Sequence, residues 1–311
     1  MRYEKILPLL LSASDVLPRR HRVRAKEEQL SCRPFYILGS GRNGSTLLGT
    51  MLNRHPDLLV IPEQFALPYA TIRYRLLNWL DWQDLVKLVV GEYSDPKNAL
   101  QPRSYTHLIP ELYAVPKPQR SLRTIVDRIV VDYGRSTGRP FTVWGDKSPL
   151  NTRMFRFIKP VVHGTRIIFL LRDGRDVVAS YMRADKDHMA DHVDPRNAAA
   201  IWKQSIRVLE ELKRTTPPGD LLIVRYEDMI SDAERTLSAI CSHLGVVFDR
   251  RTLDPENGND TMGVSGMSHH ANVQRPMLEN NTGTWKDRLD SDTLAMVLPI
   301  LESDLKFAGY H

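Results

Sequence analysis

Short apolar runs separated by helical patterns predict the architecture of this chain. Four such runs, at 35–38, 141–144, 166–171 and 221–225, are rich in leucine, isoleucine, valine and aromatic side chains. Between and after them, apolar residues recur at the spacing of an amphipathic helix. Continuous apolar strands that alternate with helices indicate a parallel sheet covered by helices on both faces. We therefore expect an α/β fold with a central parallel sheet.

Capping signals set the expected ends of two helices. Asp194 and Pro195 form an N-cap and first helical residue, so a helix is expected to run from there through Leu212. The sequence Ser-Asp-Ala-Glu at 231–234 has the pattern of a capping box, and Gly245 is a suitable C-terminal stop for the helix that follows.

Changes in composition along the chain suggest its organisation. Residues 1–32 are expected to form an N-terminal arm, whose arginine-rich stretch at 19–26 is interpreted as a solvated, partly ordered leader. Residues 33–311 are expected to form one domain. Within it, 64–135 has the character of a helical insertion, with proline-rich breaks near 96–118.

Composition limits the class of protein. The 311 residues carry a formal net charge of +6, which suits an anionic ligand without selecting one. Two distant cysteines, Cys32 and Cys241, exclude a disulfide framework and fit a reducing compartment. The apolar run 6–11 is too short for a secretory signal or a membrane span. We expect a cytoplasmic protein with no transmembrane segment; the sequence does not indicate its oligomeric state.

Glycines gather between the first predicted strand and a helix expected over 45–53. Successive backbone N–H groups in such a loop can bind an anion, helped by the positive N-terminus of the helix. An ordinary tight turn is the alternative, but the arginine and hydroxyls of this loop favour phosphate binding. The candidate ligand-binding residues are Gly41, Arg42, Asn43, Gly44, Ser45 and Thr46.

The loop differs from that of nucleotide triphosphatases at one position. Ser45 stands where the pattern G-x-x-x-x-G-K-[ST] has lysine, and the cation is instead Arg42, inside the loop. A P-loop kinase or ATPase-like enzyme remains the alternative function, but the missing lysine argues against it.

The stretch 35–56 resembles the 5'-phosphosulfate loop of the sulfotransferases. With Arg42 in place of lysine, it is more similar to the tyrosylprotein, carbohydrate and bacterial members than to the small-phenol members, and Asn43 replaces a more usual serine. The resemblance covers about 34–65 and 140–311. It implies a P-loop-like fold and transfer of a sulfuryl group from 3'-phosphoadenosine 5'-phosphosulfate, as co-substrate and without a metal, to a hydroxyl acceptor.

Two later segments extend the resemblance. Arg172, at the end of the 166–171 run, and Ser180 match the arginine and serine that hold the 3'-phosphate in this family. The alternative for Arg172 is a surface ion pair with Asp173 or Asp176. The sequence Thr-Gly-Thr-Trp-Lys at 282–286 resembles the segment that closes over the nucleotide, which adds Gly283, Trp285 and Lys286 to the candidate site.

The resemblance also assigns the chemistry. Glu63 matches the glutamate of the tyrosylprotein sulfotransferases, which implies that it is the general base. Lys147 matches a lysine in a similar Lys-x-Pro setting, which implies that it donates to the bridging oxygen of the leaving group, assisted by Arg42. The catalytic candidates are therefore Glu63, Lys147 and Arg42.

Other classes of ligand are less well supported. The adjacent His269 and His270 lack a carboxylate partner, so no metal site is predicted, and His55 before a proline is interpreted as structural. No aromatic-interleaved basic motif indicates nucleic acid as a partner. The acceptor pocket is expected from the insertion and from 185–197, and the aromatic residues named for it are Tyr69, Tyr74, Trp79 and Trp82. They would suit a carbohydrate, a small metabolite, a lipid head group or tyrosine.

Overall fold

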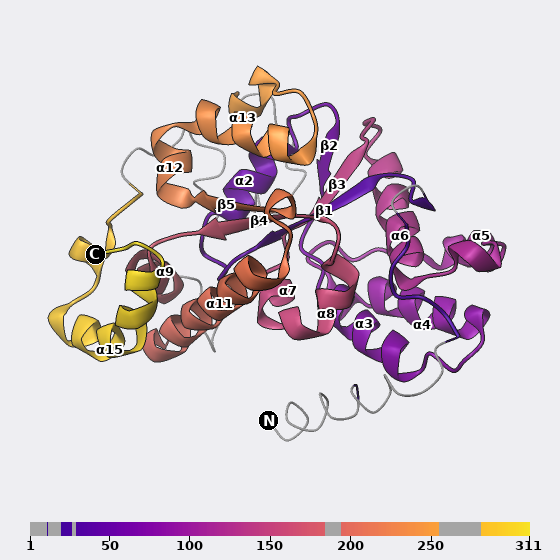
Figure 1. Cartoon of the computed structure of the whole chain (residues 1–311), viewed down its shortest axis with the longest axis horizontal. Coiled ribbons are helices and arrows are strands. Elements are labelled where there is room, and N and C mark those ends of the chain that lie inside the picture. The colour runs from indigo at the N-terminus through magenta and orange to yellow at the C-terminus, as the bar shows by residue number, and fades with distance from the viewer. Residues whose placement is uncertain (1–10, 12–19, 27–28, 184–193, 255–280) are drawn as a thin grey trace.

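Five parallel strands form the centre of the protein. The computed structural model describes residues 11, 20–26, 29–183, 194–254 and 281–311. The strands are β1 (Arg33–Leu38), β2 (Leu58–Val60), β3 (Val143–Asp146), β4 (Arg166–Leu171) and β5 (Leu221–Arg225), and they pair in the order β2-β3-β1-β4-β5. All of the pairs are parallel, so every carboxyl end lies at one edge of the sheet (Figure 1).

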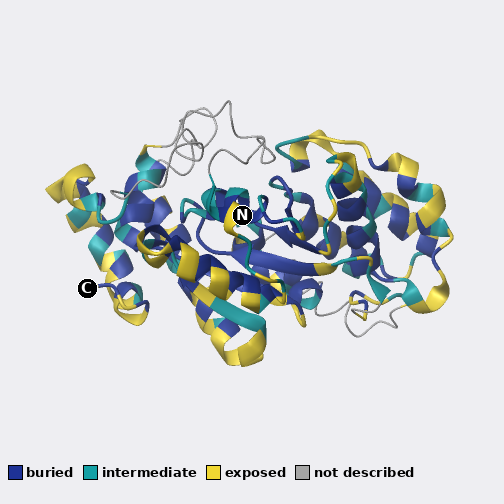
Figure 2. Cartoon of the chain, turned by 90° about the horizontal axis from the view of Figure 1, so that it is seen from above, coloured by how far each residue is buried: buried dark blue, intermediate teal, exposed yellow. Residues whose placement is uncertain are grey.

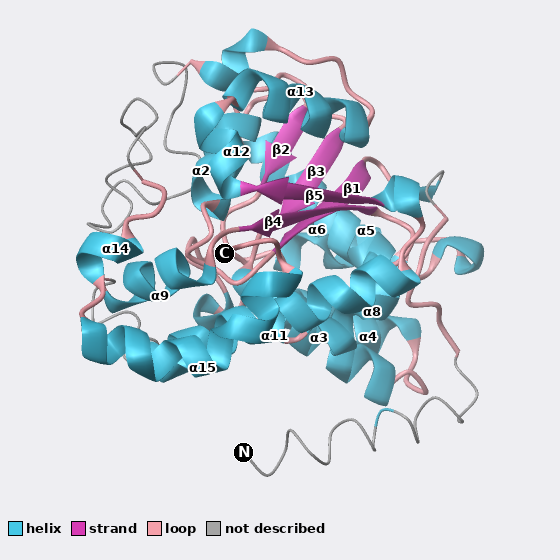
Figure 3. Cartoon of the chain, turned by 60° about the vertical axis from the view of Figure 1, so that its left-hand side comes forward, coloured by secondary structure: helices cyan, strands magenta, loops and turns pink. Residues whose placement is uncertain are grey.

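The alternation of side chains along β1 divides the core into two layers. Phe35 and Ile37 pack with α2 (Ser45–Leu52), α12 (Tyr226–Ser231) and α13 (Ala233–Leu244) on one face. Tyr36 and Leu38 belong to the larger apolar cluster on the other face. In Figure 3 the strands lie between these two groups of helices. The predicted α/β fold with helices on both faces is therefore confirmed.

The larger layer contains most of the remaining helices. They are α3 (Ala66–Leu76), α4 (Trp82–Ser94), α5 (Ile109–Tyr113), α6 (Leu122–Ser136), α7 (Pro149–Arg153), α8 (Phe155–Val162), α9 (Gly174–Met182), α11 (Pro195–Thr215), α14 (Trp285–Arg288) and α15 (Ser291–Phe307). Short 3-10 helices are η2 (Pro96–Asn98), η3 (Thr106–Leu108), η4 (Lys117–Gln119), η6 (Pro218–Asp220) and η7 (Arg250–Leu253). Figure 2 shows buried strands between helices that are exposed on their outer sides.

The described part of the N-terminal arm is held against the helices of 64–135. The backbone of His21 exchanges two hydrogen bonds with the Asn78 side chain, and Arg20 forms an ion pair with Asp81 at 2.8 Å. The Arg22 carbonyl accepts from the Tyr74 hydroxyl at 3.0 Å. Residues 20–26 are thus tied to the domain by their backbone as well as by their charges.

Most predicted elements are present, with three differences. The strand predicted at 141–144 lies two residues later, as β3 (Val143–Asp146), where it pairs with β1 and β2. The strand β2 was not predicted, because its three apolar residues carry no strand signal without the neighbouring β3. The helix α13 is capped by Asp232, whose carboxylate accepts from the Arg235 N–H, and not by Ser231, which donates to the Asp228 carbonyl. The helix α11 begins after Asp194, as predicted. Among the described helices, none is long and apolar enough to cross a membrane.

Candidate functional site

The glycine loop lies at the carboxyl edge of the sheet, between β1 and α2. Gly41, Arg42 and Gly44 have φ angles of 71°, 52° and 92°, and Arg42 is the one non-glycine residue with positive φ in the described chain. Left-handed backbone at these positions turns successive N–H groups toward one side, which makes a nest for an anion. Gly44 caps α2 without a side chain, and the first turn of α2 has no acidic residue. The positive helix end is therefore left for a ligand.

Two side chains fix the shape of this loop. Asn43 is 1% exposed; its amide donates to the Leu170 carbonyl of β4 at 2.8 Å and its oxygen accepts from the Ser45 N–H. The Tyr181 hydroxyl donates to the Ser40 carbonyl at 2.8 Å. Because the Asn43 side chain is used inside the protein, this residue can offer a ligand only its backbone.

Glycine is required at two points of the loop by space as well as by conformation. A Cβ atom on Gly41 would lie 2.6 Å from the Tyr181 hydroxyl, and one on Gly44 would lie 2.4 Å from the Tyr226 ring. Both contacts are shorter than Cβ atoms make, and both residues have positive φ. The loop backbone can therefore approach its neighbours closely only with these glycines.

Glu63 and Lys147 meet directly beside the loop. Glu63 follows β2 and Lys147 follows β3, and these strands are neighbours in the sheet. The Lys147 ammonium lies 2.7 Å from the Glu63 carboxylate and 3.5 Å from the Thr46 hydroxyl. The side chains of Lys147 and Glu63 are 1% and 16% exposed. An ammonium thus reaches the hydroxyl residue of the loop from another strand, although Ser45 replaces the lysine of the loop itself.

A hydrogen-bonded turn after β3 holds this pair in place. The buried Asp146 carboxylate accepts from the N–H and the hydroxyl of Ser148, at 2.8 and 2.7 Å. The Ser148 hydroxyl oxygen in turn accepts from the Gln64 N–H at 3.0 Å. Burial raises the pKa of Asp146, while the Ser148 hydrogen bonds oppose that rise. The turn therefore couples the position of Lys147 to the segment that contains Glu63.

Arg172 occupies the end of β4, across from the loop. It donates to the Arg42 carbonyl at 3.0 Å and to the Asn281 carbonyl at 2.7 Å, and its guanidinium lies 4.3 Å from the centre of the Tyr226 ring. Arg172 is 5% exposed, and its buried Nε has no hydrogen-bond partner among the residues that the structure describes. A buried charged donor without a partner is costly unless a ligand supplies the acceptor.

Ser180 joins this cluster through Arg42. The helix α9 extends past Ser180, whose hydroxyl oxygen accepts from Arg42 Nε at 3.3 Å. Burial lowers the pKa of the Arg42 guanidinium, and nearby Arg172 lowers it further. The structure therefore brings together Arg42, Arg172 and Ser180, three residues that the sequence places in two separate motifs.

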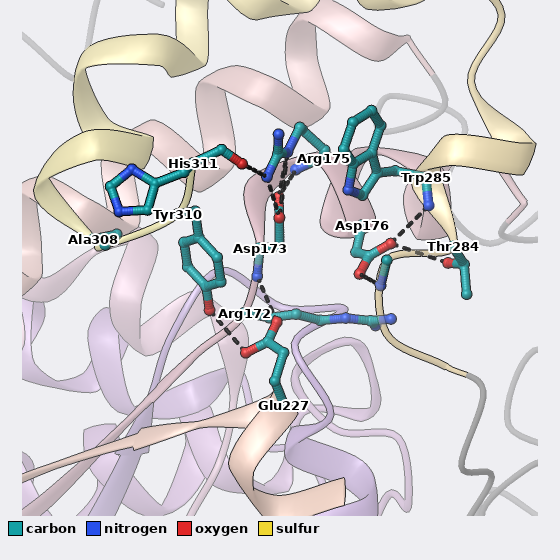
Figure 4. Close-up of polar contacts among 12 residues, drawn as sticks. Arg172, Asp173, Arg175, Asp176, Glu227, Thr284, Trp285, Ala308, Tyr310 and His311 are labelled. Atoms are coloured by element: carbon teal, nitrogen blue, oxygen red, sulfur yellow. Dashed lines mark hydrogen bonds and ion pairs between the residues drawn. The ribbon is translucent and has the colours of Figure 1, made fainter. Parts of the chain in front are cut away.

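The alternative ion pairs of Arg172 with Asp173 or Asp176 are absent (Figure 4). The Asp173 carboxylate is bound by the Arg175 guanidinium at 2.7 Å. Asp176 accepts from Gly283 N–H at 2.7 Å, from the Thr284 hydroxyl at 3.0 Å and from Trp285 N–H at 2.8 Å. The two aspartates organise neighbouring segments and leave Arg172 to other partners.

The late glycine–tryptophan segment is docked on α9 by these bonds to Asp176. The Trp285 ring is contacted by the Arg175 guanidinium at 4.2 Å from its centre, with the Lys286 ammonium at 5.9 Å. Lys286 is exposed. The segment thus lies beside the Arg172 cluster, with one aromatic face engaged by the protein itself.

The sequence analysis did not predict a group of hydrogen-bonded residues that supports the segment after Arg172. Glu227, at the start of α12, accepts from the Asp173 N–H at 3.0 Å and from the Tyr310 hydroxyl at 2.9 Å. Arg175 donates to the His311 carbonyl at 3.0 Å, so residues near 310 reach the same network (Figure 4). The sequence did contain a signal for Glu227, because polar residues follow the predicted strand 221–225. The carboxyl end of a parallel strand lies at the same edge of the sheet as the glycine loop, so these polar residues could have been expected near the site.

Positive charge dominates around this cluster. Besides Arg42 and Arg172, the side chains of Arg183 and Arg288 are close enough to act on it. Burial lowers the pKa of Arg288, and the charges of Arg183 and Arg172 lower it further. Because like charges that crowd together are unfavourable, an anionic ligand would stabilise this arrangement.

The parallel sheet, the glycine loop and the arginine cluster define a class: α/β proteins that bind a phosphate- or sulfate-bearing ligand at the carboxyl edge. The model of the sulfotransferase family matches residues 34–250, more than half of the chain. The chain therefore belongs to the sulfotransferase family, a family of transferases.

Similar proteins agree with this family. The chain is 22% identical over 279 residues to protein-tyrosine sulfotransferase A of Caenorhabditis elegans, covering 88% of this chain and 66% of that protein. It is 22% identical over 223 residues to a protein-tyrosine sulfotransferase of Drosophila melanogaster, covering 71% of this chain and 40% of that protein. The alignments thus span less than two thirds of the length of these two relatives.

A solved structure shares the fold. The sulfotransferase domain from the Synechococcus PCC 7002 olefin synthase superposes with a TM-score of 0.61 at 23% sequence identity, covering 92% of this chain and 98% of that domain.

Proposed function

We propose that the protein transfers a sulfuryl group from 3'-phosphoadenosine 5'-phosphosulfate to a hydroxyl group of an acceptor. The observation that carries the proposal is the contact of Lys147 with both Glu63 and Thr46 beside the glycine loop. This arrangement puts a proton acceptor, a proton donor and an anion-binding backbone at one point. It matches the requirements of a transfer reaction in which positioning and electrostatics dominate.

The donor would be held at two anionic ends. The backbone of Gly41–Thr46 and the N-terminus of α2 would take the 5'-phosphosulfate. Arg172, with Ser180 and Arg42, would take the 3'-phosphate, because no described residue supplies an acceptor for the buried Arg172 Nε. Gly283, Trp285 and Lys286 would lie along the nucleotide between these ends.

Each catalytic residue has a role in keeping with its position. When bound, the donor supplies the sulfuryl group and a phosphate leaving group. Glu63 would accept the proton of the acceptor hydroxyl. Lys147 and Arg42 would donate to the oxygen on which negative charge develops as the sulfur–oxygen bond breaks. The burial of Lys147 strengthens its electrostatic effect, because water screens it little.

The acceptor would enter from the side of the helical insertion. A small cavity beside Pro62 and Gln64 is lined by Tyr93, Tyr105 and Tyr133, and the buried side-chain oxygen of Gln64 has no hydrogen-bond partner among the described residues. Its volume is about 10 Å³, room for no more than one water molecule, so a phenol or a sugar would bind beside it and not inside it. The relatives named as protein-tyrosine sulfotransferases support a phenolic hydroxyl among these.

Two of the four aromatic residues expected at the acceptor site lie elsewhere. Tyr74 and Trp82 are buried in the core, where they donate to the carbonyls of Arg22 and Leu112. Tyr69 and Trp79 are exposed. Of the expected segment 185–197, residues 185–193 lie outside the described residues, whereas Asp194 caps α11 and 195–197 form its first turn.

The first test is calorimetric titration with 3'-phosphoadenosine 5'-phosphate without metal, beside ATP with magnesium. We expect the bisphosphate to bind and ATP to bind weakly. In Arg172→Ala, affinity for the bisphosphate should fall by about 2 kcal/mol or more, because a charged hydrogen-bond pair is lost. Preference for magnesium–ATP would contradict the donor assignment, and unchanged affinity in the variant would remove Arg172 from the 3'-phosphate site.

A further inference from the structure

A second cationic cavity lies at the opposite edge of the sheet from the glycine loop. It has a volume of about 320 Å³ and is lined by the first residues of three strands, Arg33 of β1, Val143 of β3 and Arg166 of β4. Arg24 and Arg123 also line it. Since β1 has six residues with a rise of roughly 3.3 Å each, about 17–20 Å separates this cavity from the loop.

Within the described residues, the arginines of this cavity outnumber its carboxylates. Arg166 forms an ion pair with Asp220 at 3.0 Å, and Asp220 is the one carboxylate that the described part of the lining contains. Arg33 donates to the Gly245 carbonyl at 3.3 Å and Arg24 to the Pro160 carbonyl at 3.1 Å. No carboxylate in the described part of the chain forms an ion pair with Arg24 or Arg33.

Carbonyl oxygens orient these guanidinium groups without neutralising them. The buried Arg123 donates to the carbonyls of Val161 and His163, among its contacts. Arginines from the arm, α6, β1 and β4 therefore line one cavity, in which Asp220 is the one carboxylate among the described residues. Planar guanidinium forks fit the oxygens of phosphate, sulfate or carboxylate, so an anion would satisfy charge and hydrogen bonding together.

The rest of the lining is mixed. Six of its members are apolar and come from the arm, the first strands and α13, namely Ala25, Leu30, Pro34, Phe35, Val143 and Leu244, and the segment His163, Gly164 and Thr165 completes it. A volume of about 320 Å³ is at the lower end of that of small-molecule sites. Arginine side chains next to apolar side chains suit a ligand that has an anionic group and a compact apolar body.

We propose that this cavity is a second ligand-binding site, which takes a small organic anion such as an aryl phosphate or aryl sulfate. The site is separate from the one proposed for the sulfuryl donor and does not depend on it. It also gives a role to Arg24, one residue of the basic cluster that the proposed sulfuryl transfer leaves unused. The competing explanation is that Arg33 and Arg123 only cap the C-terminal ends of α13 and α8.

Calorimetric titration of the full chain with phenyl phosphate tests the site, with and without saturating 3'-phosphoadenosine 5'-phosphate. We expect saturable binding under both conditions, and weaker binding of inorganic phosphate. Phenyl phosphate binding that the bisphosphate abolishes would assign it to the glycine loop and overturn the proposal. Equal affinity for inorganic phosphate would overturn the assignment of an organic ligand.

Two variants distinguish a binding site from helix capping. Arg33→Gln and Arg24→Gln should each weaken phenyl phosphate binding by roughly tenfold or more, because each removes a charged hydrogen-bond donor. Arg235→Gln, at an exposed position of α13 outside the cavity, should bind as the wild type does. If Arg33→Gln fails to fold, Arg24→Gln decides alone, since its side chain is exposed. Unchanged affinity in the folded variants, or no binding by the wild type, would leave only the capping role.

Discussion

At the scale of single residues, the proposed chemistry depends on the pair formed by Glu63 and Lys147. The two residues are 84 positions apart in the chain, yet their charged atoms lie 2.7 Å apart. Lys147 is almost fully buried, and its ammonium is bound by the Glu63 carboxylate and the Thr46 hydroxyl oxygen. Removing one member of such a pair leaves the other without its counter-charge.

The substitution Glu63→Gln should depress turnover by roughly 100-fold, because the amide cannot accept the proton of the acceptor hydroxyl. Affinity for 3'-phosphoadenosine 5'-phosphate should stay near that of the wild type. Steady-state kinetics and calorimetry on the same preparation check both parts. Glu302→Gln, at an exposed residue of α15 paired with Lys306, is the matched control. Turnover close to normal in the Glu63 variant would eliminate this residue as the base.

At the scale of elements, α9 organises the candidate donor site from two directions. Ser180, near its end, contacts Arg42 of the loop, and Asp176, in its first turn, holds the segment Gly283–Trp285. The Asp176 carboxylate accepts three hydrogen bonds from this segment. One helix thereby aligns the glycine loop with a part of the chain more than 100 residues away.

We expect Asp176→Asn to weaken binding of 3'-phosphoadenosine 5'-phosphate by roughly tenfold, because an amide nitrogen cannot accept from a backbone N–H and the segment loses an anchor. Calorimetric titration measures the change. Asp292→Asn, at an exposed residue in the first turn of α15, should leave the affinity unchanged. An unaltered affinity in the Asp176 variant would show that the 283–285 segment takes no part in nucleotide binding.

At the scale of the whole molecule, a histidine behind the sheet links stability to pH. His243 of α13 makes a hydrogen bond with the Ile167 carbonyl of β4 at 3.2 Å. Burial lowers the pKa of His243 below its usual 6.5, and the charge of Arg166 lowers it further. Below that pH the unfolded chain binds more protons at this position than the folded protein does. The free energy of unfolding should therefore be fully retained above about pH 6.5 and decrease as the pH falls below it.

Urea unfolding at pH 7.5 and pH 5.5 tests this linkage. The loss of unfolding free energy between the two pH values should be larger for the wild type than for His243→Gln, which keeps a donor for the Ile167 carbonyl but does not titrate. His21, whose pKa is also lowered by burial, contributes equally to both proteins and cancels in the comparison. Equal losses in the two proteins would contradict the assignment to His243.

The sequence predicted those parts of the fold that depend on local patterns. The apolar runs at 35–38, 166–171 and 221–225 are strands, and Gly245 ends α13 in the left-handed conformation. The strand β2 could not be predicted, because three residues become a strand only by pairing with β3. The N-cap of α13 is Asp232 and not the predicted Ser231. Both residue types are good N-caps, so the choice between them depends on the backbone conformation.

By itself, the sequence determined the glycine loop, the arginine at the end of β4 and the family, because these are encoded by residues close together in the chain. Only the tertiary structure decided which distant groups meet. Parallel strands bring Glu63, Lys147 and Thr46 to one edge, and they leave four arginines around a cavity at the other. The physical reason is that local sequence specifies backbone conformation, whereas strand order and register decide which charges become neighbours.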